Sequence, residues 1–190
     1  MSECGYCGLS DEKSLRKKQL KNNVTVIGCS GCGNFEIKGA DGKGQTVSCG
    51  KCDYEKINPE KLKVDSSTGA IYYDCFCGGK TIWPVSKEGY IGESYICKCA
   101  DCCGDKENKD LFTIILGNGE CALSWCECCA QYTLSSKEGN VIVDNKLMKE
   151  IVEKTTNLKL SQSLTRFIKR CSGLNYFEGV PFSIPPKRGN

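Results

Sequence analysis

Cysteine is the residue that most constrains this chain. Seventeen of its 190 residues are cysteine and none is histidine. Leu, Ile, Val and Phe together number 41, about 22% of the chain, which is just above the range typical of disordered sequences. One conventional apolar core is therefore insufficient, and we expect the cysteines to supply stability through bound metal or disulfides.

Metal-bound thiolates fit the cysteine spacing better than disulfides do. The cysteine count is odd, and many cysteines lie in close CxC, CxxC and CC groups, which are unusual in a secreted disulfide scaffold. Residues 1–7 contain neither a basic nor an apolar run, so the sequence predicts no secretory signal. No apolar run approaches the roughly 20 residues of a membrane span. We therefore expect no membrane contact and a reducing, intracellular compartment: cytoplasm, nucleus or a virion assembled there.

Residues 29–52 contain the clearest motif. A CxxC group at 29 and 32 and another at 49 and 52 are separated by 16 residues. Between them, alternating apolar and polar side chains flank a glycine-rich segment at 39–44, which predicts two strands joined by a turn. Two CxxC turns brought together by such a hairpin can complete a tetrahedral shell of four sulfurs around one ion.

This segment resembles a zinc ribbon, a small hairpin fold built around one structural zinc ion. The resemblance covers 24 of the 190 residues and rests on the two CxxC groups and on Gly33. It implies a zinc ion held by four thiolates, those of Cys29, Cys32, Cys49 and Cys52. Zinc ribbons of transcript-cleavage factors have adjacent acidic residues at the hairpin tip, whereas this tip has Asp41 alone. Their activity is therefore not expected here.

Two later stretches repeat the pattern more loosely, with a cysteine group, a predicted strand, a turn and a second predicted strand. Their predicted strands lie at 81–85, 95–96, 132–134 and 141–143. The tetrapeptide Ser-Lys-Glu-Gly occurs at 86–89 and again at 136–139. This recurrence indicates either a duplicated unit or a chance match at two turns.

Sixteen cysteines, all except Cys171, are the predicted metal ligands, and they would fill four four-sulfur shells. They are Cys4, Cys7, Cys29, Cys32, Cys49, Cys52, Cys75, Cys77, Cys97, Cys99, Cys102, Cys103, Cys121, Cys126, Cys128 and Cys129. One grouping closes each site within a hairpin, and its sets are 29/32/49/52, the safest site, and 75/77/97/99. The other grouping takes the cysteines in chain order, and its sets are 4/7/29/32 and 49/52/75/77. Spacing alone does not decide between them.

Zinc is the expected metal, at about four ions per chain, because tetrahedral thiolate shells are its usual structural sites. Iron is the alternative, since the two CxxC groups at 29–52 also resemble those of rubredoxin. Rubredoxin has a proline after the first cysteine of its second CxxC group, whereas this chain has Gly50. The dense cysteines at 97–129 are similar to metallothionein in spacing. Metallothioneins, however, lack apolar strands such as the one predicted at 111–116. The CxxC group at residues 4–7 also matches a dithiol redox motif, but no strand precedes it to present it.

The sequence predicts a non-enzymatic protein. Without histidine there is no imidazole base and no Cys–His or Ser–His pair. The glycine-rich segment at 39–46 lacks the spacing and the Lys-Ser/Thr of a P-loop. Closed four-sulfur shells leave no coordination position for water, so the expected metal sites are structural.

The expected fold is small, metal-stabilised and β-rich, with tandem zinc-ribbon-like hairpins at 1–144. A basic helical segment at 145–175 and an extended Pro-rich tail at 176–190 follow it. We expect one helix capped by Asp144, another capped by Ser161 or Ser163 that buries the Cys171 thiol, and a short helix at 10–21.

Charge is unevenly distributed along the chain. Residues 145–190 contain 9 Lys/Arg and 3 Asp/Glu, whereas residues 22–144 contain 12 and 17. We therefore expect a component of a larger assembly, such as a capsid, a ribonucleoprotein or a transcription complex. Its protein partners would bind the basic C-terminal region and the tail, where Phe182 and Ile184 are apolar anchors. The alternative is a nucleic-acid-binding or transcription-associated zinc-ribbon protein.

Overall fold

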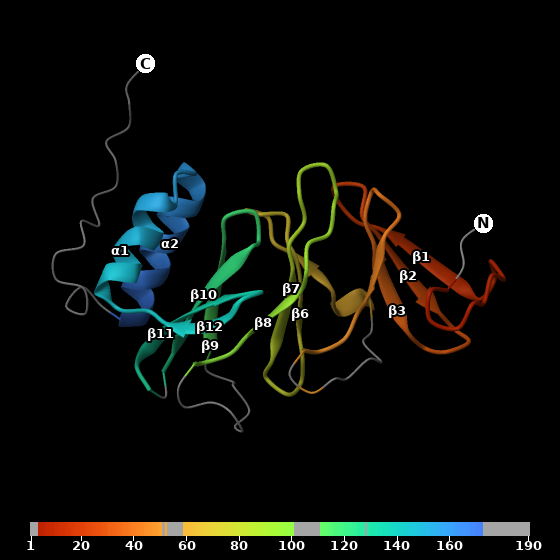
Figure 1. The fold of residues 1–190 in the computed structure, drawn as a ribbon, viewed down its shortest axis with the longest axis horizontal. Coiled ribbons are helices and arrows are strands. Elements are labelled where there is room, and N and C mark those ends of the chain that lie inside the picture. The colour runs from red at the N-terminus through yellow and green to blue at the C-terminus, as the bar shows by residue number, and fades with distance from the viewer. Residues whose placement is uncertain (1–3, 51, 53–58, 101–110, 128, 173–190) are drawn as a thin grey trace, which may run out of the picture.

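The computed structural model describes residues 4–50, 52, 59–100, 111–127 and 129–172. Within these ranges the chain forms three four-stranded antiparallel sheets followed by two helices. The prediction of a small β-rich fold with C-terminal helices is confirmed at this level. Figure 1 shows the sheets following one another along the molecule, with the helices at one end. Neither described helix is long and apolar enough to cross a bilayer.

Each sheet is a meander in which the strands pair in chain order. The first sheet contains β1 (Leu15–Gln19), β2 (Thr25–Cys29), β3 (Phe35–Lys38) and β4 (Gly44–Thr46). A 3-10 turn, η1 (Pro59–Lys61), precedes the second sheet, which contains β5 (Lys63–Val64), β6 (Ile71–Asp74), β7 (Lys80–Trp83) and β8 (Tyr95–Cys97). The third sheet contains β9 (Leu111–Leu116), β10 (Cys121–Cys126), β11 (Gln131–Ser136) and β12 (Gly139–Ile142). The helices are α1 (Asn145–Lys154) and α2 (Leu158–Ser172).

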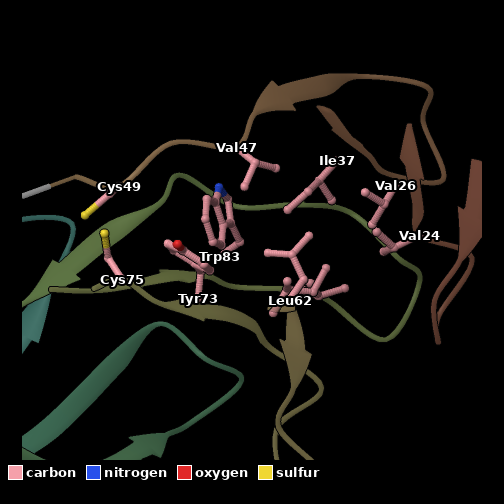
Figure 2. Close-up of a cluster of buried hydrophobic side chains, with 11 residues drawn as sticks. Val24, Val26, Ile37, Val47, Cys49, Leu62, Tyr73, Cys75 and Trp83 are labelled. Carbon is pink, nitrogen blue, oxygen red and sulfur yellow. The ribbon is translucent and has the colours of Figure 1, made fainter. Parts of the chain in front are cut away.

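The first two sheets share one apolar core. Val26 and Ile37 of the first sheet pack with Tyr73 and Trp83 of the second, and all four side chains are buried. Figure 2 shows these side chains facing one another, with the sulfurs of Cys49 and Cys75 at one end of the cluster. The chain therefore builds its core between sheets, because strands of two to six residues cannot enclose one alone.

Two further cores continue this arrangement along the molecule. A small one joins Ile82 and Tyr95 of the second sheet to Ile115 and Ala122 of the third. The other packs α1 and α2 on the third sheet through Trp125, Tyr132 and the inward faces of both helices. The buried helix positions are Met148, Ile151, Leu160, Leu164 and Ile168. In the described part of the chain, these small cores in series take the place of one large core.

The predicted helix at 10–21 is wrong, because this segment contains the edge strand β1. Its apolar residues Leu15 and Leu20 lie five positions apart, about 140° apart around a helix, and so define no common helical face. As a strand, Leu15 pairs with Cys29 and packs against Ile27. Cross-strand burial of Leu15 therefore decides the structure.

The two C-terminal helices begin at side-chain caps. Asp144 caps α1 as predicted, and its Oδ1 accepts a hydrogen bond from the Leu147 N–H at 2.8 Å. The second helix begins earlier than predicted, because Asn157 Oδ1 accepts from the Leu160 N–H at 3.2 Å. Neither Ser161 nor Ser163 is the cap, and both lie within α2.

Candidate metal centres

The cysteines follow the same order in all three sheets. A leading pair begins at Cys4, Cys49 or Cys99, before the first strand of each sheet. A second group lies at the turn between the second and third strands of each sheet. The two Ser-Lys-Glu-Gly segments both belong to the connection from the third to the fourth strand of a sheet, although Ser136 ends β11 and Gly139 begins β12. Among the described residues, the first two sheets share one cysteine arrangement, and Cys99, Cys126 and Cys129 lie at corresponding places of the third sheet.

Two sets of four thiols converge in the structure. The first centre is formed by Cys4, Cys7, Cys29 and Cys32, and the second by Cys49, Cys52, Cys75 and Cys77. Within each set all four sulfurs lie within 4.8 Å of one another. In each set, two sulfurs come from the leading pair and two from the turn between the second and third strands. Each centre therefore joins the start of a unit to the middle of its sheet.

The sulfur separations fit one tetrahedral ion in each centre. In the first centre Cys4 Sγ lies 3.8 Å from Cys32 Sγ, and Cys7 Sγ lies 3.7 Å from Cys29 Sγ. In the second centre the corresponding separations are 3.5 Å for Cys49–Cys77 and 3.6 Å for Cys52–Cys75. Four sulfurs bound at about 2.3 Å to one tetrahedral ion lie about 3.8 Å apart, whereas a disulfide joins its sulfurs at about 2.05 Å. The geometry matches thiolate ligands and not disulfides.

A third group contains three described thiols. The sulfurs of Cys99, Cys126 and Cys129 lie within 4.8 Å of one another, and the Cys99–Cys129 separation is 3.4 Å. Cys99 and Cys126 are buried. Three more predicted ligands in this part of the chain, Cys102, Cys103 and Cys128, lie outside the described residues.

Local backbone groups favour ionisation of particular thiols. The N–H groups of Cys32 and then Gly31 donate to the Cys29 sulfur and, against burial, lower the pKa of Cys29 to about 7. Burial opposes ionisation of Cys77, but the Gly79 N–H, 3.4 Å from its sulfur, helps to lower the pKa of that thiol. Such donated hydrogen bonds stabilise a thiolate in the form that binds metal.

Crowding of the sulfurs opposes ionisation of Cys7. The Leu9 N–H lowers the pKa of Cys7, but the adjacent Cys4 thiol, burial and the Cys29 and Cys32 thiols together raise it to about 12. Four sulfurs this close cannot all be thiolates without a compensating cation. The donor set therefore suits a divalent ion that thiolates bind well.

The hairpin grouping 29/32/49/52 is wrong, and the chain-order grouping is the one that forms. After β4 the chain leaves the first sheet, since Val47 and Cys49 are fully buried in the core shared with the second sheet. The Gly50 N–H then donates to Thr81 Oγ1 of β7 at 3.1 Å. These contacts hold Cys49 beside the turn at 75–77 and away from Cys29.

The same hydrogen bond recurs in the third sheet. Here the Ala100 N–H donates to Thr133 Oγ1 of β11 at 3.1 Å. Gly50 and Ala100 each follow the first cysteine of a leading pair, and Thr81 and Thr133 each lie in the third strand of a sheet. The two threonines hold the residues that follow Cys49 and Cys99. The spacing of the cysteines gives no signal for these threonines. Comparison of the chain with itself, at shifts near 50 residues, would have aligned Thr81 with Thr133.

Two predicted ligands lie apart from the three groups. Cys97 is fully buried in the core between the second and third sheets, and burial raises the pKa of its thiol to about 12. Cys121 is half-buried against the third core, and burial also raises its pKa. The grouping 75/77/97/99 and the count of four complete sites are therefore not met among the described residues. Cys171, predicted as a core thiol, is half-buried on α2 against the same core.

Comparisons with protein-family models, with curated proteins and with solved structures find no match to this chain.

Proposed function

We propose that this chain is a non-enzymatic zinc-binding protein in which three zinc-ribbon-like units form a rigid component of a larger assembly. The observation that carries the proposal is the pair of four-thiol centres with sulfur separations of 3.5–3.8 Å. Tetrathiolate shells are typical of structural zinc and support folding directly. Iron in the same four-sulfur shell is the competing assignment. An iron-loaded protein would be coloured, and its optical spectrum would reveal the metal.

One cleft in the described part of the chain bears on whether the protein has a catalytic role. This cleft, of about 710 Å³, lies between loops of the sheets and the two helices, and its carboxylates include Asp65 and Glu150. Asp65 Oδ1 accepts hydrogen bonds from the backbone of Ser67 and from Thr68, so it closes its own turn. Glu150 lies 3.9 Å from Lys154 within α1. Both carboxylates thus make contacts within their own turn or helix, which supports a structural role for them.

The third centre lacks one ligand among the described thiols, and the sequence indicates which cysteine completes it. The leading pairs of the first two centres are CxxC groups, and Cys99 has the same spacing to Cys102. A repeated unit would use the same spacing in its third copy. We therefore assign the fourth sulfur to Cys102 in preference to Cys103 or Cys128.

Substitution Cys102→Ser is expected to lower the metal content from three ions per chain towards two, because the third centre would lose one of four thiolates. Cys103→Ser is the matched control and should retain three ions, since it removes a neighbouring thiol. Elemental analysis of both purified variants makes the comparison. Loss of an ion in the Cys103 variant alone would show that the assignment is wrong.

The exposed face of α2 is the proposed contact for the partner. Lys159, Arg166, Lys169 and Arg170 are exposed on this helix, which contains no carboxylate. Two of the three lysines of α1 differ, because Lys149 and Lys154 have glutamates of the same helix within 4.0 Å. Metal-loaded centres add negative charge elsewhere, so the positive charge is concentrated at the helical end. The tail at 176–190 lies outside the described residues.

Neutralising three exposed cations of α2 is expected to release the chain from its assembly. The variant Lys159→Gln, Arg166→Gln, Lys169→Gln leaves Arg170 in place, because its guanidinium stacks 5.0 Å from the Phe112 ring. The matched control changes Lys146, Lys149 and Lys154 of α1 and alters net charge equally. Lysates of the native cells that contain each variant are separated by sedimentation. The α2 variant should move to slowly sedimenting fractions, whereas the control should not. Equal sedimentation of both variants would place the contact elsewhere.

A nucleic acid is the second candidate partner, because the side chains of α2 suit phosphate binding. Its exposed charged side chains are all hydrogen-bond donors, and two are arginines, which bind phosphate in a bidentate manner. Fluorescence anisotropy with labelled single-stranded and duplex oligonucleotides separates the candidates. Binding that weakens steeply with salt, and weakens further in the α2 variant, would support the nucleic acid.

A further inference from the structure

The two complete centres expose the same ligand position. Cys7 and Cys52, each the second cysteine of a leading pair, are exposed. The first cysteine of each leading pair is buried, with Cys4 6% and Cys49 0% exposed. The first cysteine of each turn group is buried as well. Two centres that share no residue thus leave the same sulfur position open to solvent.

We propose that Cys7 and Cys52 are modification sites, at which soft electrophiles and hydroperoxides attack the metal-loaded protein. The proposal rests on the metal binding proposed above. A metal-bound thiolate sulfur keeps lone pairs and remains nucleophilic, so access decides which of the four ligands reacts first. Cys4, Cys29, Cys49 and Cys75 are buried and Cys32 and Cys77 are half-buried, whereas a reagent reaches the exposed Cys7 and Cys52 without opening a sheet.

Reaction with a maleimide illustrates the simplest outcome. The Cys7 sulfur adds to one carbon of the maleimide double bond, a carbon–sulfur bond forms, and the other carbon takes a proton from water. No group leaves. The resulting thioether is a poor ligand compared with a thiolate, so the first addition weakens the centre.

Reaction with a hydroperoxide gives a disulfide between the exposed cysteine and another cysteine of the same centre. The exposed sulfur attacks the peroxide, the oxygen–oxygen bond breaks, and an alkoxide or hydroxide leaves, so that a sulfenic acid forms. A neighbouring thiolate then attacks this sulfur and displaces hydroxide, and the two electrons lost by the thiolates have reduced the peroxide. Cys29 Sγ lies 3.7 Å from Cys7 Sγ, and Cys75 Sγ lies 3.6 Å from Cys52 Sγ. The expected disulfides are Cys7–Cys29 and Cys52–Cys75, and each removes two ligands from its ion.

Timed labelling of the full metal-loaded chain tests the first step. A brief pulse of isotopically heavy N-ethylmaleimide is followed by denaturation, chelation and complete labelling with the light reagent, and mass spectrometry gives the heavy fraction at each cysteine. Cys7 and Cys52 should label roughly tenfold faster than Cys4 and Cys49, in line with the dependence of thiol reactivity on exposure. Cys97, which is fully buried, is the slow internal reference.

Peroxide treatment of the same preparation tests the second step. Peptide mapping should find Cys7–Cys29 and Cys52–Cys75 disulfides, and a chromogenic chelator should report metal release in step with their formation. Uniform labelling, faster labelling at Cys4 and Cys49, or disulfides within the CxxC pairs would overturn the inference while leaving metal binding intact. The metal content of the starting sample is measured first, and a metal-free chain would overturn both proposals.

Discussion

Removal of the metal by a strong chelator is expected to unfold the three sheets and not merely to loosen them. Each structural zinc ion in a thiolate site contributes an apparent free energy of about 10–16 kcal/mol at neutral pH. A typical domain has a net stability of only about 5–15 kcal/mol. The short strands and small cores of this chain leave no reserve that would compensate for the loss of the ions.

The two tryptophans report on different parts of the molecule during chelation. Trp83 is 1% exposed in the core between the first and second sheets, and Trp125 is 5% exposed in the core beneath the helices. Both should lose their near-ultraviolet circular dichroism and shift their fluorescence to the red. Readdition of Zn²⁺ should restore the signals, whereas Mg²⁺ should not, because it prefers oxygen ligands. Retention of both signals in metal-free protein would contradict a structural role for the ions.

Substitution Cys49→Ser is expected to have the largest effect of any single change in the chain. The Cys49 sulfur belongs to the second centre, and its side chain is also fully buried in the first core. Serine preserves the size of the side chain, but removes a thiolate and buries a hydroxyl. The expected loss exceeds about 4 kcal/mol of unfolding free energy, which is the range reached when a metal site is lost.

Cysteines outside the centres provide the control for this substitution. Cys171→Ser changes a half-buried thiol on α2 and should cost about 1 kcal/mol or less. Urea unfolding in the presence of zinc compares the two variants, and Cys29→Ser should resemble Cys49→Ser. Similar losses in all three variants would show that the cysteines act as ordinary core residues.

The sequence predicts the secondary structure better than the cysteine pairing. Alternating side chains indicate β3 at 35–38 and the apolar run at 111–116 indicates β9, and the structure has both strands. The grouping of cysteines depends instead on where the chain goes after β4. Burial of Val47 against the second sheet, which no local pattern reveals, moves Cys49 into the next unit.

The number of sites could not be read from the number of cysteines. A thiol buried as a small apolar side chain and a thiol that binds metal have the same sequence letter. Cys97 ends β8 and faces the core between two sheets, whereas Cys99, two residues later, joins the third group. Only the direction of the chain after β8 distinguishes them.

X-ray absorption at the zinc edge, on protein purified without added metal, tests the central proposal most directly. We predict four sulfur neighbours at about 2.3 Å around each zinc ion, with three ions per chain, one for each thiol group. A shell containing nitrogen or oxygen ligands would contradict tetrathiolate centres. A metal-free chain with its thiols paired as disulfides would contradict the proposed function altogether.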